Sequence, residues 1–112
     1  MAFQEQFSIN DLGTFKISPS IKKFTLMDLG FVVNNAGAFV MKRSLQPEKP
    51  VDQAISLKVV VKKDLSSLKV DVVGAAGGSV DIKKRDDRAE MTELVSFFLK
   101  ELVDRQVLEQ VA

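Results

Sequence analysis

The chain has 112 residues, of which 46% are hydrophobic and 28% are charged. These values are typical of one globular domain and argue against disorder. We therefore expect a single α+β domain over residues 1–112. Its 16 basic and 15 acidic residues leave a net charge of +1, which gives no electrostatic reason to expect a nucleic acid or a membrane surface as partner.

The sequence contains neither cysteine nor histidine. The first absence excludes disulfides and thiolate chemistry, and the second removes the commonest general base and metal ligand. We expect no metal, no cofactor and no catalytic residue, although carboxylates, lysines and hydroxyls leave an enzyme open. The N-terminal residues lack the basic and apolar regions of a secretory signal, and no apolar run approaches the ~20 residues that span a bilayer. These features predict a cytoplasmic protein.

In chain order, the first predicted element is a β-hairpin, because apolar residues alternate on both sides of the turn-forming stretch 10–13. A helix over residues 19–29 follows. Ser18 is placed as its N-cap and Pro19 at its first position, and Gly30 is a natural helix end. A second hairpin is predicted from residues 31–33 and 38–43, with a long surface loop after it.

Three alternating strands over residues 55–63, 68–72 and 80–82 predict an antiparallel meander with one buried face. For the first turn, the favoured register sets Lys58 opposite Asp71 and keeps the apolar residues of both strands on one face. For the second turn, the favoured register sets Lys69 opposite Asp81. The alternative sets Asp71 opposite Asp81, a like-charge pair that would favour a carboxylate site.

The polar face of this meander is the predicted binding surface, and its candidate binding residues alternate in charge: Lys58, Lys69, Asp71, Asp81 and Lys83. Such alternation is typical of a solvated sheet face whose charges neutralise one another. A nucleic-acid platform would need one sign of charge and stacking aromatic residues, which this face lacks. We therefore expect no nucleic-acid partner.

Two short motifs receive structural interpretations. The glycine-rich stretch 74–78 lies between two predicted strands and not before a helix, so it favours a hairpin turn over a phosphate-binding loop. The Ser-x-x-Lys spacing of Ser20 and Lys23 lacks the companion motifs of penicillin-recognising enzymes, so we attribute it to chance.

The last predicted element is a helix over residues 88–107, which packs on one sheet face through an apolar stripe. Asp87 and Glu90 have the spacing of a capping box. With Asp86 and Glu93 they form an acidic cluster, for which capping and pairing with the neighbouring arginines is favoured over a hard-cation site. Phe97 lies on the polar side of this predicted helix, and Leu108 lies three turns farther along. Apolar side chains on a polar face predict a surface that contacts a second copy or another protein.

Four stretches, residues 18–26, 28–31, 43–45 and 57–59, resemble a family of small uncharacterised proteins from lactobacilli and related Gram-positive bacteria, catalogued as domain of unknown function 1831. The resemblance implies a TATA-box-binding-protein-like fold in the order β-α-β(4)-α, here with an added N-terminal hairpin. It also implies a loose association with genes for a cysteine desulfurase and tRNA thiolation, in which a chain without cysteine would have an accessory role. DNA binding does not follow from the fold.

Two functions of different classes stay open. The first is a non-catalytic accessory or protein-interaction module that binds a partner, or a second copy, through the C-terminal helix or an edge strand. The alternative is a small-molecule or anion-binding domain that uses a pocket between sheet and helices, with lysine or arginine as the charged group. Nucleic-acid binding ranks third.

Overall fold

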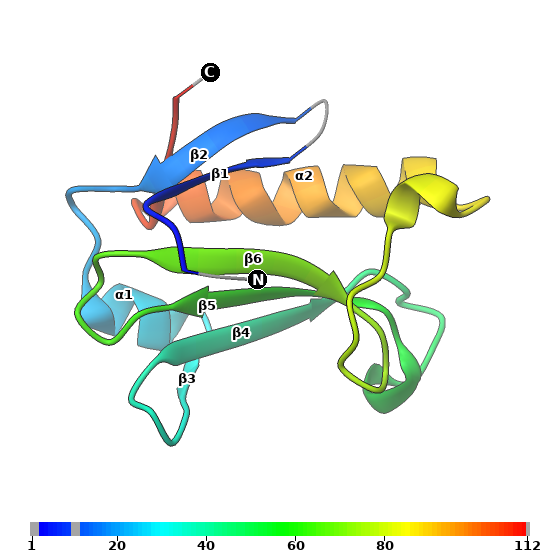
Figure 1. Cartoon of the computed structure of the whole chain (residues 1–112), viewed down its shortest axis with the longest axis horizontal. Coiled ribbons are helices and arrows are strands. Elements are labelled where there is room, and N and C mark those ends of the chain that lie inside the picture. The colour runs from blue at the N-terminus through cyan, green and yellow to red at the C-terminus, as the bar shows by residue number, and fades with distance from the viewer. Residues whose placement is uncertain (1–2, 10–11, 112) are drawn as a thin grey trace.

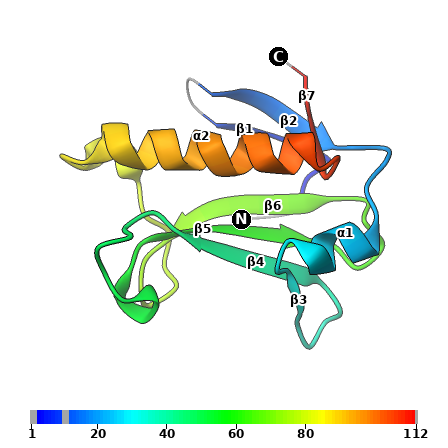
Figure 2. The same ribbon diagram turned by 180° about the vertical axis from the view of Figure 1, so that it is seen from behind.

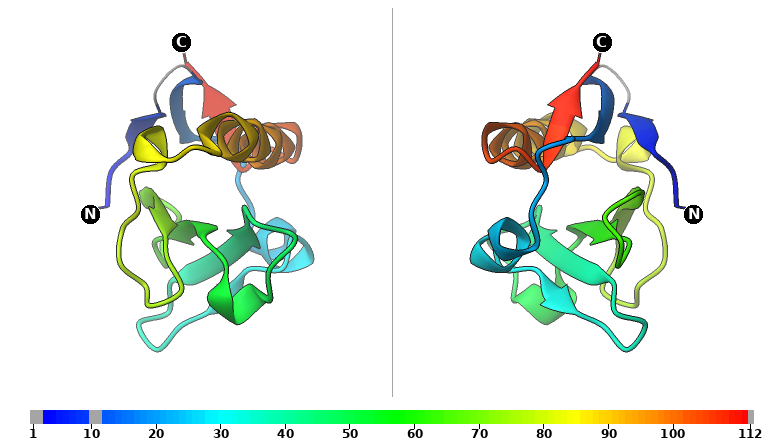
Figure 3. Two further views of the ribbon diagram at one scale, coloured as in Figure 1. Left: turned by 90° about the vertical axis from the view of Figure 1, so that its right-hand side faces the viewer. Right: turned by 90° about the vertical axis from the view of Figure 1, so that its left-hand side faces the viewer.

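A long helix near the C-terminus, α2 (Arg88–Asp104), organises the fold (Figure 1). The computed structural model describes residues 3–9 and 12–111. Below α2 lies a four-stranded antiparallel sheet, and a three-stranded antiparallel sheet lies against the helix from the other side (Figure 3). The larger sheet has the order β3 (Val32–Val33), β4 (Phe39–Ser44), β5 (Ser56–Val61) and β6 (Leu68–Val73). The smaller has the order β1 (Gln6–Ile9), β2 (Gly13–Ile17) and β7 (Leu108–Gln110).

The predicted α+β class, with antiparallel strands and a C-terminal helix, is confirmed. Four strands lie between the short helix α1 (Lys23–Asp28) and α2, as expected. A second sheet was not expected, and the likeness to TATA-box-binding protein receives no support. Two short 3₁₀ helices, η1 (Val51–Gln53) and η2 (Ile82–Lys84), complete the elements.

The N-terminal hairpin is confirmed by the antiparallel pairing of β1 with β2. Phe7 pairs with Phe15, and their buried rings stack with centroids 5.5 Å apart. The turn residues Asn10 and Asp11 lie outside the described residues. The pair of rings anchors the smaller sheet to the core.

The predicted helix over residues 19–29 is wrong in its first part, because α1 begins only at Lys23. Ser18 is still part of the extended chain, since its N–H donates to the Val107 carbonyl at 3.0 Å. Its hydroxyl accepts from the Ser20 N–H at 3.1 Å and so stabilises a turn instead of capping the helix. Pro19 therefore lies in that turn and not at a helix start.

The predicted helix end at residue 107 is also wrong, because α2 stops at Asp104 in a Schellman motif. Gln106 adopts φ +62°, the left-handed conformation that Gly usually fills at this position. The Gln106 N–H donates to the Val103 carbonyl at 3.0 Å, and the Val107 N–H to the Leu102 carbonyl at 2.9 Å. The chain then reverses and forms β7, a strand that no sequence pattern predicted.

The predicted register of the first turn of the meander is confirmed. Lys58 lies opposite Asp71, and the apolar pairs of β5 and β6 match as expected: Leu57 with Val72, Val59 with Val70, and Val61 with Leu68. The second hairpin, between residues 31–33 and 38–43, is also confirmed by the pairing of β3 with β4. Period-two patterning was sufficient here because one face of each strand is buried.

The predicted strand over residues 80–82 and its register are wrong. Val73 forms an isolated bridge with Ser79, and the Val80 N–H donates to the Val72 carbonyl at 2.8 Å. This offset, if continued, would set Asp71 opposite Asp81, but the pairing stops at Val80 and the chain turns into η2. The glycine-rich stretch 74–78 is a hairpin turn as predicted, closed by the Gly74 N–H on the Gly78 carbonyl at 2.8 Å.

One hydrophobic core joins both sheets and α2. The buried face of the helix consists of Met91, Val95, Leu99 and Leu102, and these side chains belong to the same core cluster as residues of both sheets. A shared core of this kind is what a single domain has, and the extent of the domain over residues 1–112 stays a prediction. Within the described part of the chain, no helix is long and apolar enough to cross a membrane.

Candidate functional site

A cleft opens where the two sheets part from each other. They are joined by a bridge in which Gln4 and Leu68 exchange two backbone hydrogen bonds, each 2.8 Å long. Beyond Gln4 the chain bends and rises into the other layer as β1, while β6 continues in the larger sheet (Figure 1). The opening between β1 and β6 is one part of the cleft, and the second part extends along η2 to the first turns of α2.

The two parts form one continuous cleft, because both are lined by Ile9, Ile82, Lys83 and Val95. The inner part, between β1 and β6, has a volume of about 230 Å³. The outer part, between the β1–β2 hairpin and α2, has a volume of about 520 Å³, which lies within the range of small-molecule sites, roughly 300–1,000 Å³. The shared apolar residues give the cleft a hydrophobic wall over its whole length.

The structure brings three of the five predicted binding residues to this cleft: Asp71, Asp81 and Lys83. The two aspartates line only the inner part, Lys83 lines both parts, and Arg88 lines only the outer part. The aspartates therefore lie in the inner part, Arg88 lies in the outer part, and Lys83 lies where the two parts meet. The shared apolar wall lies along the same cleft.

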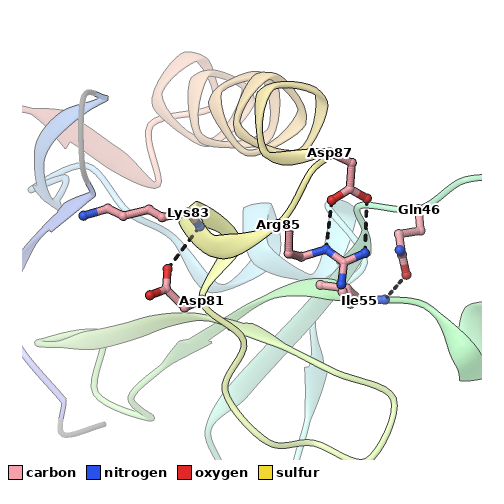
Figure 4. A network of polar contacts seen from close by, with 6 residues as sticks. All are labelled: Gln46, Ile55, Asp81, Lys83, Arg85 and Asp87. Atoms are coloured by element: carbon pink, nitrogen blue, oxygen red, sulfur yellow. Dashed lines mark hydrogen bonds and ion pairs between the residues drawn. The ribbon is translucent and has the colours of Figure 1, made fainter.

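Local hydrogen bonds hold the two carboxylates. Asp71 accepts from the Val72 N–H at 2.9 Å and from the Ser79 hydroxyl at 2.5 Å. Asp81 is the N-cap of η2, where its Oδ1 accepts from the Lys83 N–H at 3.1 Å (Figure 4). Each carboxylate has further lone pairs that can accept from a ligand.

The two cations of the cleft are available for an anion. In Figure 4 the Lys83 side chain extends away from Asp81 toward the ribbon of β1. Arg88 donates one hydrogen bond, from Nη1 to the Lys83 carbonyl at 3.3 Å, which holds its guanidinium near Lys83. None of the acidic residues in the described part of the chain forms an ion pair with either cation.

The other two predicted binding residues lie outside the cleft. Lys58 is half-buried in the middle of the larger sheet, between Lys42 of β4 and Asp71 of β6. Lys69 faces Val60 across the ladder, and its Nζ lies 4.8 Å from the centre of the Phe3 ring. A cation–π contact of this kind explains its position without a ligand.

Several cleft residues were missed by sequence reasoning, among them Gln4, Ser8, Arg88 and Thr92. Gln4 and Ser8 lie about 80 positions before Arg88 and Thr92, and the strands of the meander lie between these two segments in the chain. No local pattern connects them. Arg88 carried the one usable signal, since it follows the charged stretch at the start of the predicted helix. It was interpreted there as a partner for the acidic cluster.

The acidic cluster is arranged around one ion pair. Asp87 makes no capping hydrogen bond, so the predicted capping box is wrong. Its carboxylate instead accepts two hydrogen bonds from Arg85, at 2.8 and 3.3 Å (Figure 4). The bonds from Arg85 lower the pKa of Asp87 and raise the pKa of Arg85. In the part of the chain that the structure describes, no group of acidic residues is arranged to hold a metal ion.

The two predicted interface residues have different environments. Phe97 is 61% exposed, so a contact with another molecule stays a prediction for it. Leu108 is only 2% exposed and packs in the core as part of β7. The prediction that Leu108 contributes to a surface is wrong, because the helix ends before it and the chain turns inward.

These features define a class of protein: a small two-sheet α+β domain with a cleft that has an apolar wall and is lined by both acidic and basic residues. The chain belongs to the family of domain of unknown function 1831, described as putative amino acid metabolism, which matches residues 1–109. A DUF1831 family protein from Lactobacillus plantarum, known from a crystal structure at 1.20 Å resolution, is 37% identical, with 99% of each chain covered and a TM-score of 0.84. No curated protein matches the chain.

Proposed function

We propose that this protein is a binding domain of amino acid metabolism and that the cleft binds an amino acid or a similarly small zwitterion. The observation that carries the proposal is the separation of charge along the cleft. Asp71 and Asp81 line only its inner part, Arg88 lines only its outer part, and Lys83 lines both. An α-amino acid has an ammonium and a carboxylate group beside an often apolar side chain. The cleft offers a complement to each of these three parts.

The contacts in the proposed complex follow from the chemistry of the side chains. The guanidinium of Arg88 and the ammonium of Lys83 donate to the ligand carboxylate, and such charge-assisted bonds are the strong ones in proteins. The carboxylates of Asp71 and Asp81 accept from the ligand ammonium group. The wall of Ile9, Ile82 and Val95 accommodates an apolar side chain.

The residue inventory supports binding rather than catalysis. The sequence has no histidine and no cysteine, so proton transfer and covalent catalysis would depend on carboxylates, lysines and hydroxyls. Asp71 and Asp81 are both engaged in local hydrogen bonds that hold the turn and η2. We therefore propose an accessory protein that holds an amino acid for another enzyme. The association with a cysteine desulfurase, implied by the family resemblance, is one specific version of this proposal, since the substrate of that enzyme is itself an amino acid.

A thermal-shift screen with the 20 common amino acids tests the proposal. A ligand present at a hundredfold excess over its Kd stabilises by about 2.7 kcal/mol, which corresponds to a rise of about 10 °C in Tm for a domain of this size. Analogues that carry only the ammonium or only the carboxylate group should stabilise less. The absence of stabilisation by any amino acid at saturating concentration would contradict the proposal.

Variants of the cleft separate specific from non-specific stabilisation. Asp81→Asn removes one negative charge but keeps an oxygen that can cap η2, so it should weaken binding without loss of fold. Lys69→Gln is the matched control, because Lys69 lies outside the cleft beside Phe3. Equal stabilisation of both variants by the same amino acid would place the ligand elsewhere.

A further inference from the structure

A second surface, distinct from the cleft, is basic and apolar. It lies on α1 and is formed by Lys22, Lys23, Phe24 and Met27, here called the α1 patch. Phe24 is 65% exposed and Met27 is 52% exposed, and their spacing of three residues places them on the same side of the helix. The Nζ of Lys22 lies 5.7 Å from the centre of the Phe24 ring. Neither lysine forms an ion pair within the described part of the chain.

A third surface is acidic and apolar. It is a groove of about 520 Å³ between α2 and the loop after β4, here called the acidic groove. Its apolar part includes Leu45, Pro47 and Phe97, and its acidic part includes Glu48, Glu90 and Glu93. The ring of Phe97 is held in an edge-to-face contact with Phe98, with centroids 5.7 Å apart, and the rest of it is exposed.

The charge of the groove is not cancelled locally. Arg85 is bound to Asp87, and Lys49 is near enough to lower the pKa of that same carboxyl group. Glu48, Glu90 and Glu93 form no ion pair with any described residue. Three exposed carboxylates therefore line the same groove as an exposed aromatic ring. A complementary surface must be basic and carry a large apolar side chain.

The α1 patch meets that description. Helix α1, which carries the patch, and the loop after β4, which borders the acidic groove, lie on the same side of the molecule (Figures 2 and 3). Two contacts fix α1 beside the C-terminal end of α2 and the edge of the larger sheet. Asp28 forms an ion pair with Arg105 at 3.9 Å, and Arg43 donates to the Leu29 carbonyl. The groove lies beside residues 87–97, so the two surfaces are roughly 20 Å apart along the axis of α2.

We propose that two copies of this chain associate about a twofold axis, with the α1 patch of each copy in the acidic groove of the other. Two complementary surfaces on one side of a molecule meet twice when the second copy is turned by 180°. The resulting contact is closed, so it produces a dimer and not a filament. Phe24 of each copy packs against Phe97 of the other, and Lys22 and Lys23 face Glu90 and Glu93.

Charge exchange tests this arrangement. Lys22→Glu with Lys23→Glu, or Glu90→Lys with Glu93→Lys, should each weaken self-association by on the order of 100-fold, because like charges then face each other. The chain with all four substitutions keeps the net charge of +1 and should dimerise again. A matched control combines Glu90→Lys and Glu93→Lys with Lys62→Glu and Lys63→Glu. This control also has a net charge of +1, but lysines still face lysines in the contact. It should therefore stay monomeric.

Sedimentation velocity over a range of protein concentrations gives the readout. The proposal predicts a concentration-dependent dimer for the wild type and for the fourfold exchange, and monomers for the two charge-reversed chains and the matched control. A wild-type chain that stays monomeric at millimolar concentration would overturn the proposal. A chain with all four substitutions that fails to dimerise would also overturn it, provided that its circular dichroism matches that of the wild type. Neither result bears on the cleft, which lies on a different side of the molecule.

Discussion

Gln106 offers a substitution whose effect can be worked out from backbone geometry. It follows the last turn of α2 with φ +62°, and its side chain is exposed. A residue with a Cβ atom pays about 1–2 kcal/mol in this conformation, whereas Gly does not. The Schellman hydrogen bonds from the N–H groups of Gln106 and Val107 are made by the backbone and remain in a Gly variant.

We therefore expect Gln106→Gly to stabilise the protein. The gain is reduced by the larger conformational entropy of Gly in the unfolded chain, which costs about 0.4–1 kcal/mol. The net increase in the free energy of unfolding should be about 0.5–1 kcal/mol, with a rise in Tm of about 2–4 °C. Urea denaturation and a thermal scan measure the two quantities independently.

Matched substitutions separate the backbone effect from the loss of the glutamine side chain. Gln106→Ala removes the same side-chain atoms but keeps Cβ, so it should bring no gain. Gln106→Asn should lie between Ala and Gly, because Asn tolerates the left-handed region better than most residues. A Gly variant no more stable than the Ala variant would refute the assignment of backbone strain to Gln106.

Three further substitutions test the packing, the bridge between the sheets and the Arg85–Asp87 pair. Leu102 is fully buried, so Leu102→Ala should lower the free energy of unfolding by about 2–5 kcal/mol. Phe97 is exposed, so Phe97→Ala should change it by less than about 0.5 kcal/mol. Chemical denaturation of both variants measures the two changes. Gln4→Pro removes the N–H that bonds Leu68 and should cost about 1 kcal/mol, while Gln4→Ala keeps the bond and should be nearly neutral by the same assay. Because the pKa of Asp87 is lowered by Arg85, the pair stabilises the fold above the ordinary pKa of aspartate, about 3.9, and this contribution is lost as pH falls through the lowered value. Arg85→Gln should therefore differ from the wild type at neutral pH, and the two denaturation curves should converge at about pH 2; an unchanged difference at low pH would contradict the assigned cause.

The sequence predicted the larger sheet well where one strand face is buried. The register of β5 and β6 followed from period-two patterning together with the pairing of Lys58 with Asp71. The same argument failed at the next turn, because it assumed that a third strand must continue. The chain avoids a contact between Asp71 and Asp81 by ending the ladder at Val80, and Asp81 then caps η2.

The end of α2 could not be predicted for a different reason. Val103 and Val107 continue the helical spacing of apolar residues, and a Schellman motif is usually signalled by Gly. Here Gln106 occupies the left-handed position, so the usual signal is absent. The strand β7 was missed as a result, and Leu108 was placed on a surface although it lies in the core.

The cleft was only partly predictable. Asp71, Asp81 and Lys83 were selected as polar residues of one sheet face, yet they come together because the sheet edge, the turn and η2 meet there. Their partners from β1 and α2 are distant in sequence, and the bridge between Gln4 and Leu68 together with the shared core brings those elements into position. Tertiary placement of this kind leaves no local pattern.

Calorimetric titration with the amino acid that stabilises most in the thermal screen tests the central claim most directly. Charge-assisted hydrogen bonds contribute about 1.5–3 kcal/mol, so Arg88→Gln should weaken binding by roughly 10–100-fold. Arg105→Gln is the matched control, because Arg105 pairs with Asp28 far from the cleft, and it should leave the Kd unchanged. Equal affinities of the wild type and Arg88→Gln would contradict the account that the cleft holds the ligand carboxylate.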